Sequence, residues 1–491
     1  MRSVHTVESV RAAEDALMAT LPAGALMERA AVGLATACGR ALGRTYGARV
    51  CVLAGTGNNG GDALIAGALL ARRGAQVEAV LIDRDRVHEA GIRRLLAAGG
   101  RVSEDHVRSV ARAALTLDGV LGIGGRPGVR GEAADLLDAA ADSGGLLVAV
   151  DLPSGVHADT GETPSRHARA DLTVTFGVHK VAGVVDPAAA ACGEVRLVDI
   201  GLRPYLGPAN IEVLDDADVS VALPRAGRNA HKYNRGVVGV VAGSEQYTGA
   251  GVLSVGGAVR GGAGMVRHVG DQQVSAAVRS AWPEVVTGPG RVQAWVVGPG
   301  VGTDPGDGGY AVRWTLEQAA AAEPTVPVLI DADGLRHFAD AFPQAGPVEG
   351  RPPVVLTPHA GELARLLEVE RSEVEARRLA SAREAAERYG AVVLLKGSTT
   401  VIADRDGRVR VNVTGTSALA TAGTGDVLTG LVGALLATGL EPWEAASVGA
   451  HVHGRAGQVA AVRVGYPSAG DVLDALPVAL VELRRPRPSS W

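Results

Sequence analysis

The sequence predicts an α/β protein made of two doubly wound domains. Short apolar segments rich in valine and leucine alternate with segments of helical periodicity along most of the chain. Many of the apolar segments end in loops rich in glycine, asparagine or aspartate, as strands of open α/β sheets do. A length of 491 residues leaves room for more than one domain.

Composition excludes several classes of function. Hydrophobic residues make up 47% and charged residues 21%, which is typical of a globular protein. Aromatic residues make up only 3% and the net charge is −5, so we expect no nucleic-acid partner. The N-terminus lacks an apolar signal core, and no long charge-free span predicts a membrane helix. Three scattered cysteines without metal-site spacing indicate a reducing compartment and no structural zinc. We therefore expect a cytoplasmic protein.

Lysine is unusually rare, with only Lys180, Lys232 and Lys396 among 48 Lys and Arg residues. A compact ammonium suits a point contact to phosphate, whereas arginine offers a planar fork. All three lysines lie in or beside glycine-rich segments, which favours functional positions over solvated surface.

The first half opens with two predicted amphipathic helices, then a strand, a glycine-rich loop and a helix. The predicted ranges are 5–20 and 24–44 for the helices, 50–54 for the strand, 55–62 for the loop and 63–73 for the next helix. Strand, loop and helix in this order form a nucleotide-binding opening. The loop fits neither the Gly-x-Gly-x-x-Gly fingerprint nor a Walker loop. Its side chains Asn58 and Asn59 suit a hard cation or a carboxamide.

Later strand ends in this half carry further polar residues. The strand at 114–118 ends at Asp118 and runs into a loop where Arg126 is suited to a phosphate. The strand at 146–150 ends at Asp151, which is either catalytic or merely the start of a proline turn. Asn59, Asp118 and Ser154 all lie at or just past strand ends, so they can converge on one cation. The other predicted elements are strands at 76–82, 172–176 and 195–199 and helices at 87–98 and 131–143.

Together these motifs resemble the NAD(P)H-hydrate epimerase domain over roughly residues 1–210. The motifs are Gly-Thr-Gly-Asn-Asn-Gly-Gly-Asp, Asp-x-x-x-Gly-x-Gly and Asp-Leu-Pro-Ser-Gly. The resemblance implies a Rossmann-like domain, a potassium ion held by Asn59, Asp118 and Ser154, and a damaged nicotinamide nucleotide as substrate. It implies substrate contacts from Asn58, Asn59, Gly60, Gly61, Asp62, Gly122, Ile123, Gly124, Gly125, Arg126, Pro127, Gly128 and the catalytic Asp151. Ala63 departs from the glycine that many members have there.

A domain boundary is predicted near residue 215, which gives domains 1–214 and 215–491. Residues 202–224 contain three prolines and an acidic run and show no strong period. Beyond them, strands are predicted at 237–242, 294–297, 327–330, 353–357 and 391–395. A small-residue helix follows the first of these strands, and another helix is predicted at 361–367.

The stretch from Lys396 to Gly433 is the strongest functional signal in the second half. Its glycine-rich turn, 423–425, opens an apolar helix that continues to about Ala437. The free N–H groups at such a helix start bind anions. A carboxylate there repels phosphate unless it acts on another group, so Asp426 is either a base or a simple helix cap. His359, in Thr-Pro-His-x-Gly-Glu, is either functional or a turn residue.

The second half resembles the ribokinase-like family of ADP-dependent NAD(P)H-hydrate dehydratases, from about 220 to 485. The match rests on Gly-Ser-x-x-Tyr-Thr-Gly-Ala, Gly-Pro-Gly-Val-Gly, Thr-Pro-His-x-Gly-Glu, Lys-Gly-Ser-x-Thr and Gly-Thr-Gly-Asp-Val-Leu. By this resemblance, Ala250, Gly302, His359 and the catalytic Asp426 face the hydrated nucleotide. Lys396, Gly397, Ser398, Thr399, Thr400 and Gly425 hold ADP, which carries Mg²⁺.

Both resemblances imply one pathway of nicotinamide nucleotide repair. The epimerase interconverts (R)- and (S)-NADHX or NADPHX, and the dehydratase converts the (S) epimer to NAD(P)H with AMP and phosphate as co-products. The alternative is a ribokinase-like vitamin-precursor kinase fused to a non-catalytic nucleotide-binding module. We expect a homo-oligomer, because Ala- and Gly-rich helices permit close assembly.

Overall fold

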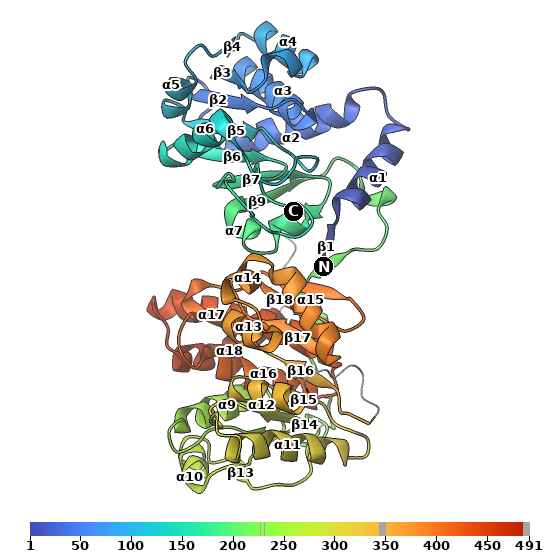
Figure 1. The fold of residues 1–491 in the computed structure, drawn as a ribbon, viewed down its shortest axis with the longest axis vertical. Helices are drawn as coiled ribbons and strands as arrows, with labels where there is room; N and C mark the ends of the chain where they lie inside the picture. Colours follow the sequence, from blue (N-terminus) through green and yellow to red (C-terminus); the bar gives the residue numbers. More distant parts are fainter. Residues whose placement is uncertain (226, 230, 343–349, 485–491) are drawn as a thin grey trace. The chain divides into compact units, whose positions relative to one another are not determined.

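The protein folds as two compact units, each built on its own sheet. The computed structural model describes residues 1–225, 227–229, 231–342 and 350–484 (Figure 1). One unit comprises Ser3–Ile211, and the other comprises Met1–Arg2 and the described residues from Glu212 onward. Among the described residues, no helix combines the length and apolar composition needed to cross a lipid bilayer.

The first unit contains a seven-stranded sheet in which all paired strands are parallel. The strand order is β4 (Arg101–Val102), β3 (Gln76–Leu81), β2 (Arg49–Ala54), β5 (Leu115–Gly119), β6 (Leu146–Val150), β7 (Leu172–Phe176) and β9 (Glu194–Val198). Counted along the chain, this order is that of a Rossmann-like doubly wound sheet. Its direction of winding reverses between β2 and β5, and ligands bind at such a reversal.

Helices cover both faces of this sheet. Residues of α1 (Val7–Met18), α2 (Ala25–Leu42), α3 (Asn58–Arg72) and α4 (Glu89–Ala97) share one apolar core with the strands. Residues of α5 (His106–Ala111) and α6 (Gly131–Asp142) form the core on the other face. The helix α7 (Ala188–Cys192) follows this core in the chain. A short parallel pair is formed by β1 (Arg2–His5) and β8 (His179–Lys180).

The second unit has a larger sheet with an antiparallel hairpin at one side. Its order is β13 (Val286–Thr287), β12 (Met265–His268), β11 (Val237–Val241), β14 (Ala294–Val297), β15 (Val328–Ile330), β16 (Val354–Leu356), β17 (Val392–Leu395), β18 (Thr400–Ala403) and β19 (Val409–Asn412). Glu212 of β10 (Ile211–Val213) pairs with β19. The strands are parallel as far as β17, and β18 and β19 form the hairpin. The winding reverses between β11 and β14.

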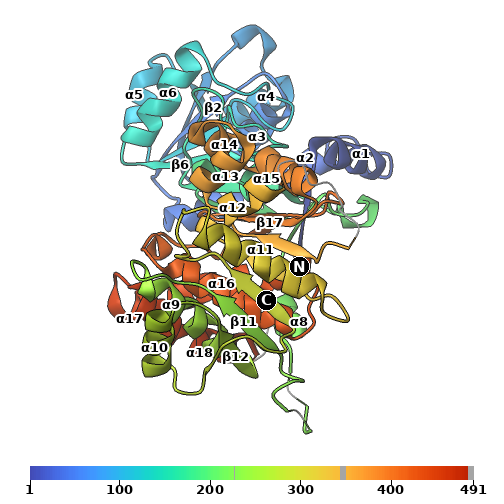
Figure 2. The ribbon, with the colours of Figure 1, turned by 60° about the horizontal axis from the view of Figure 1, so that its bottom comes forward.

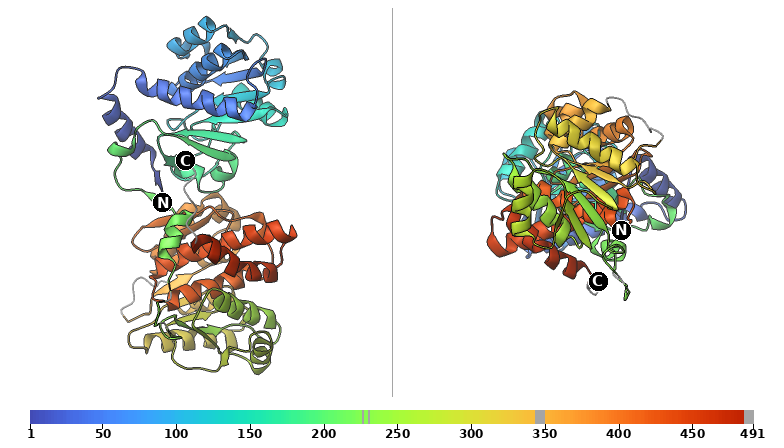
Figure 3. Two further views of the ribbon diagram at one scale, coloured as in Figure 1. Left: turned by 180° about the vertical axis from the view of Figure 1, so that it is seen from behind. Right: turned by 90° about the horizontal axis from the view of Figure 1, so that it is seen from below.

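Two helical layers sandwich this second sheet (Figure 2). One layer holds α11 (Asp307–Ala320), α12 (Asp333–Ala341), α13 (Ala360–Leu367), α14 (Arg371–Ala376) and α15 (Arg378–Tyr389). The other holds α9 (Thr248–Arg260), α10 (Gln272–Ala281), α16 (Thr424–Ala437), α17 (Pro442–Val464) and α18 (Ala469–Arg484), which share one apolar core. Helices α17 and α18 lie side by side (Figure 3). Every residue of α16 from Val427 to Ala437 is buried, as its apolar sequence predicted.

Two local predictions were wrong. The segment 202–224 was predicted to be aperiodic, but it contains β10 and α8 (Asp216–Ala222). Its acidic run is a capping box in which the Asp215 carboxylate accepts the backbone N–H of Asp218. The loop at 55–62 was predicted to precede the helix, but α3 already begins at Asn58. Glycines allow this early start, because a Cβ on Gly60 would lie 2.2 Å from the carbonyl oxygen of Gly55.

Candidate active sites

The predicted cation ligands of the first unit come together where β2 and β5 end. The Ser154 hydroxyl donates to Asp118 Oδ1 at 2.5 Å, and the Ser154 backbone N–H donates to Asp118 Oδ2 at 2.8 Å. A Cβ on Gly122 would lie 2.9 Å from Asn59 Oδ1, so the asparagine packs directly against the loop after β5. The buried Asn59 Nδ2 has no hydrogen-bond partner among the described residues. An amide nitrogen only donates, so this group calls for an acceptor such as a substrate oxygen, and Oδ1 is the atom of Asn59 that suits a cation.

Burial governs the charge of Asp118. Its side chain is fully buried, and this raises the pKa of the carboxyl to about 6, against the opposing effect of hydrogen bonds from Ser154 and Val120. A carboxylate, a hydroxyl and the side-chain oxygen of Asn59 form the oxygen-rich set that a hard cation takes. A bound cation would favour the ionised carboxyl, so the donor set fits the implied potassium ion.

Asp151 is held in a strained conformation beside a buried lysine. Its backbone has φ of 65°, which L-residues rarely adopt. Lys180 Nζ donates to Asp151 Oδ1 at 2.6 Å, and the Thr175 hydroxyl and Phe176 N–H donate to the same oxygen at 3.0 and 3.1 Å. No described residue donates a hydrogen bond to Oδ2, so that oxygen is open to a substrate proton. Strain over-determined by surrounding bonds is common at catalytic positions.

A second carboxyl in this region is poised as an acid. Asp62, in the first turns of α3, is 9% exposed, and its Oδ1 has no hydrogen-bond partner among the described residues. Burial, and then repulsion from Asp151 and Glu14, raise the pKa of Asp62 well above its usual value. Asp62 therefore favours its protonated form, as the acid of a site does.

The glycine-rich loop after β5 borders a cavity of about 220 Å³. Its lining comprises Val7, Arg11, Ile123, Gly124, Gly125, Pro127, His157, Ala158 and Asp159. Four of these residues belong to the predicted substrate loop, whereas Arg126 of the same loop is exposed and does not line the cavity. His157 accepts the backbone N–H of Asp159 at 3.3 Å.

The second site lies at the carboxyl ends of β15, β16 and β17. Lys396 Nζ donates to Asp331 Oδ1 at 2.7 Å and lies 3.7 Å from Glu362 Oε2. Thr429 of α16 donates to the other oxygen of Asp331 at 2.7 Å. A Cβ on Gly425 would lie 3.5 Å from Lys396 Nζ, so two of the predicted ADP contacts, Lys396 and Gly425, are neighbours at the start of α16.

Electrostatics at this site favour a proton on Asp426. Burial raises the pKa of Asp426 to about 7, and repulsion from Asp331, Asp333 and Glu362 adds to this effect, while Lys396 opposes it. Burial would lower the pKa of Lys396, but attraction to Asp331 and the other carboxylates leaves it raised. Lys396 therefore stays cationic, and Asp426 can exchange a proton near neutral pH.

His359 caps α13 and faces the same carboxylates. The imidazole Nδ1 of His359 accepts the backbone N–H of Glu362 at 3.1 Å. The backbone N–H of His359 in turn donates to Glu362 Oε2 at 2.7 Å. Burial, and the charge of Lys396, lower the pKa of His359 against the attraction of Glu362. His359 therefore has a structural role as the N-cap of α13. It also lies beside Glu362 and Lys396, so it remains a candidate site residue.

The glycine loop after β14 packs against the start of α9. A Cβ on Gly300 would lie 2.9 Å from the Cβ of Ala250, and Gly302 donates its N–H to Asp333 Oδ2 at 3.0 Å. Gly423 contacts Leu253 of α9 and lies near Asp426. The structure thus brings Ala250, Gly302 and Asp426 to one end of the sheet. By contrast, the side chains of Thr399 and Thr400 are buried, with exposures of 8% each.

Sequence reasoning missed three residues that organise this site. Asp331 directly follows the predicted strand at 327–330, and Glu362 ends the motif Thr-Pro-His-x-Gly-Glu, so these positions were the available signal. Arg378 gave no signal, because it lies inside the ordinary-looking sequence of α15. Its Nη2 donates to the carbonyl oxygens of Leu395, Lys396 and Thr399 at 3.3, 2.9 and 3.2 Å, so it fixes the shape of the Lys396 loop.

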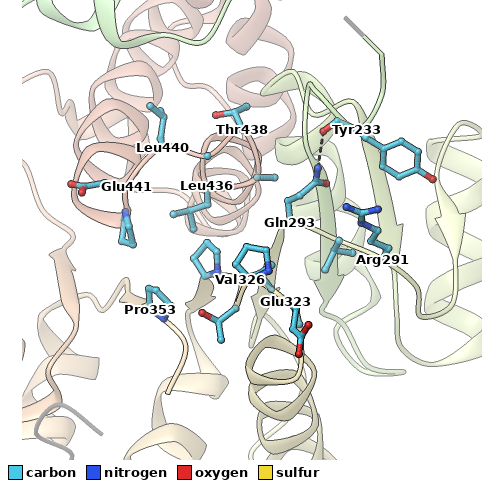
Figure 4. A pocket seen from close by; sticks show the side chains of 18 of the residues that line it. Tyr233, Arg291, Gln293, Glu323, Val326, Pro353, Leu436, Thr438, Leu440 and Glu441 are labelled. Carbon is cyan, nitrogen blue, oxygen red and sulfur yellow. Dashed lines mark hydrogen bonds between the residues drawn. The ribbon is translucent and has the colours of Figure 1, made fainter. Parts of the chain in front are cut away.

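A further cavity of the second unit lies at the other end of the sheet. It has a volume of about 720 Å³ and is lined by residues that precede β14, β15 and β16 and by the end of α16 (Figure 4). Tyr233, Arg291 and Gln293 form one wall, where Gln293 donates to the Tyr233 carbonyl at 2.7 Å. None of the predicted site residues lines it.

Each half of the chain matches a known protein family. The family model for NAD(P)H-hydrate dehydratase matches residues 238–477, and the model for the YjeF-related protein N-terminus matches residues 23–182. The bifunctional NAD(P)H-hydrate repair enzyme Nnr of Mycobacterium tuberculosis is 46% identical over 91% of this chain and 92% of its own length. The chain belongs to the family of bifunctional NAD(P)H-hydrate repair enzymes. The family predicted from the motifs is thus confirmed.

Further relatives and solved structures extend the comparison. The repair enzyme of Mycobacterium leprae is 45% identical over 96% of both chains. A ribokinase-like superfamily protein of Enterococcus faecalis has a TM-score of 0.50 and 23% identity, covering 57% of this chain and 99% of its own, which supports the ribokinase-like fold. An ADP/ATP-dependent NAD(P)H-hydrate dehydratase of Bacillus subtilis, co-crystallised with ATP/Mg²⁺, has a TM-score of 0.49 and 28% identity, covering 56% and 99%.

Proposed function

We propose that residues 1–214 form an epimerase domain and residues 215–491 an ADP-dependent dehydratase domain of one nicotinamide nucleotide repair enzyme. The first interconverts (R)- and (S)-NAD(P)HX, and the second converts (S)-NAD(P)HX and ADP to NAD(P)H, AMP and phosphate. The observation that carries this proposal is the cluster of Asp426, Lys396 and Asp331 at the start of α16. It places a base of near-neutral pKa beside an anion-binding helix start.

In the dehydratase, Asp426 takes the proton of the C6 hydroxyl as its oxygen attacks the terminal phosphoryl group of ADP. The new O–P bond forms while the bond to the AMP oxygen breaks, so AMP leaves. Phosphate is a better leaving group than hydroxide, and the ring nitrogen's electron pair expels it. Loss of the C5 proton then restores the dihydronicotinamide. Lys396 and the backbone N–H groups at the start of α16 offset the charge that develops on the phosphates.

The carboxylates around Lys396 suit a divalent cation that arrives with the nucleotide. Mg²⁺ is usually held by one or two carboxylates together with substrate phosphates. No group of three or more His, Cys, Asp or Glu side chains within the described ranges is arranged to hold a metal directly. Asp331 and Glu362 are the residues nearest Lys396 and would hold Mg²⁺ through the nucleotide, where the ion supplies charge neutralisation.

In the epimerase, Asp62 and Asp151 move protons at the C6 hydroxyl. The ring nitrogen assists cleavage of the C6–O bond, and protonated Asp62 supplies the proton that lets the oxygen leave as water. Water then adds to the opposite face of the ring and gives its proton to Asp151. Asn59, Asp118 and Ser154 would hold potassium, which supplies fixed positive charge beside the substrate. The free, buried cysteines support a cytoplasmic location, and the Ala- and Gly-rich helices support a homo-oligomer.

The proposal is tested by following the reduced-nicotinamide absorbance of mixed NADHX epimers while ADP or ATP is added in turn. Full recovery of NADH with ADP supports both activities. Recovery that stops partway, with one epimer left, would show that the epimers interconvert only at their uncatalysed rate. The first unit would then have no epimerase activity. No recovery with either nucleotide favours the vitamin-precursor kinase, which would instead form a stable phosphorylated product from ATP.

A further inference from the structure

The cavity beside the glycine-rich loop of the first unit contains an arginine that neither the sequence motifs nor the family resemblance had assigned. Arg11 lies on α1 and lines this cavity together with Gly124 and Gly125. A Cβ on Gly124 would lie 2.7 Å from Arg11 Nη2, so the guanidinium rests directly on the backbone of the loop. A side chain at position 124 would displace the guanidinium from this contact.

The position of Arg11 is fixed although its side chain is exposed. The first residue of α1, Val7, donates its N–H to Asp159 Oδ1 at 2.7 Å. On the opposite face of the helix, Val10, Ala13 and Leu17 are buried in the core of the unit. The helix is therefore anchored at its start and along one side, and it presents Arg11 to the loop.

The guanidinium has no hydrogen bond or ion pair with any described residue, although the cavity also contains Asp159. That carboxylate is engaged by the Val7 N–H, and Glu14 of the same helix acts on Arg11 electrostatically without forming an ion pair with it. A planar guanidinium over a glycine backbone is suited to a phosphate oxygen, which accepts hydrogen bonds from both.

We propose that Arg11, with the backbone of Gly124 and Gly125, forms a subsite for a phosphate group of the dinucleotide substrate. This inference rests on the proposed epimerase function and adds a binding residue from outside the motif loops. NADHX carries only the pyrophosphate, whereas NADPHX also carries a 2′-phosphate. Arg11 contacts one of these groups, and the two substrates distinguish them.

The test compares full-length wild type with Arg11→Ala and Arg11→Lys. The (R) epimers of NADHX and NADPHX are used separately, without ADP, and epimer ratios are followed by chromatography. Arg11→Ala is expected to raise KM by about tenfold or more with kcat nearly unchanged, and Arg11→Lys should recover part of the loss. A rise in KM for both substrates identifies the pyrophosphate as the group that Arg11 contacts. A rise in KM for NADPHX alone identifies the 2′-phosphate. An unchanged KM for both overturns the subsite.

Arg93→Ala serves as the matched control. Arg93 lies on α4, exposed, and pairs only with Glu89 of the same helix at 3.0 Å, so its removal should leave KM unchanged. If wild type itself fails to interconvert the epimers, the proposed function fails rather than the subsite. Calorimetric binding of inorganic pyrophosphate and of inorganic phosphate then decides: weaker binding of either ion to Arg11→Ala than to wild type and Arg93→Ala supports the subsite, and equal binding of both ions overturns it.

Discussion

At the scale of single residues, the chemistry of the second site depends on carboxyl groups that outnumber the lysine beside them. Asp331, Asp333, Glu362 and Asp426 act electrostatically on one another, and Lys396 is the cation that acts on Asp426 with them. One carboxyl in such a group holds its proton to a higher pH than the others. Asp426 is that carboxyl, and it lies at the start of α16, where we propose that phosphate binds.

Replacing Asp426 by asparagine should abolish chemistry while keeping the fold. Asp426→Asn keeps the size of the side chain but removes the base, so dehydration of (S)-NADHX should slow by about three orders of magnitude or more. ADP binding, measured by calorimetry, should remain, because Lys396 and the helix start are unchanged. Near-normal turnover of this variant would exclude Asp426 as the base.

The same substitution should change the pH dependence of stability. The folded-state pKa of Asp426 is raised to about 7, so between about pH 4 and 7 the folded protein binds a proton that the unfolded chain does not. Stability from this group is therefore present at low pH and is lost as pH rises through 7. Asp426→Asn should be more stable than wild type at pH 8 by about 1–2 kcal/mol, after allowance for partial exposure. Urea unfolding at pH 5 and pH 8 measures the difference, which should shrink to about a third of its pH 8 value at pH 5 and vanish only below about pH 4.

The dehydration rate should rise with pH, whereas the stability contributed by Asp426 falls. A base must be ionised, so kcat/KM for dehydration should rise with pH and level off above an apparent pKa near 7. Initial rates with ADP over pH 5.5–9, roughly two pH units either side of that pKa, test this. A flat profile across neutral pH would assign the proton transfer to another group.

Lys180 makes the corresponding contribution in the first unit. Its side chain is 1% exposed, and its ammonium compensates the carboxylate of Asp151. Lys180→Met leaves that carboxylate buried without its cation and should destabilise the unit by about 3–5 kcal/mol. The double variant with Asp151→Asn should recover part of this loss. Lys232→Met, at an exposed lysine, is the control, and equal urea midpoints for the Lys180 and Lys232 variants would contradict the prediction.

At the scale of elements, the start of α16 is positioned by the close packing of that helix on α9. A Cβ on Gly430 would lie 1.9 Å from the carbonyl oxygen of Ser254 and 2.7 Å from the backbone nitrogen of Ala258. The two backbones therefore touch, and no side chain fits between them. This contact fixes α16 against α9, whose first turn carries Ala250.

Widening this contact should destabilise the second unit. Gly430→Ala forces α16 away from α9 and should cost about 2–4 kcal/mol, although alanine is the better helix former. Gly249→Ala, on α9 where a Cβ meets nothing within 4 Å, should be neutral or slightly stabilising. Thermal unfolding of both variants measures the contrast. Equal transition temperatures would show that the two helices can separate without strain.

At the scale of the whole molecule, two doubly wound sheets each place a site at the ends of parallel strands. In the first, the site lies at the reversal between β2 and β5, and in the second it lies at the ends of β15 to β17 and the start of α16. Each site is complete within its own unit, so the two activities should be separable by point substitution.

Variants that inactivate one site should therefore spare the other. Asp151→Ala with ADP should consume the (S) epimer at the wild-type rate and leave (R) to its slow uncatalysed conversion. Asp426→Asn should still equilibrate the epimers without forming NADH. An equimolar mixture of the two variants should restore complete recovery, as followed by absorbance and chromatography. A mixture that stalls at the (S) endpoint would contradict independent sites.

The sequence by itself determined the central strands of both sheets, their glycine-rich ends and the motif residues, because these depend on periodicity and local backbone demands. It did not predict the outer strands β12 and β13. It placed Asn59, Asp118, Ser154, Lys396 and Asp426 at strand or helix ends before any contact was known. It could not place the start of α3 at Asn58, since Asn and Gly favour turns locally and only packing against β2 selects the helix. Tertiary structure alone decided the partners: Lys180 against Asp151, Arg378 on the Lys396 loop and Arg11 over Gly124. Such contacts join residues far apart in the chain, and a burial-driven pKa exists only once the surrounding side chains have excluded water.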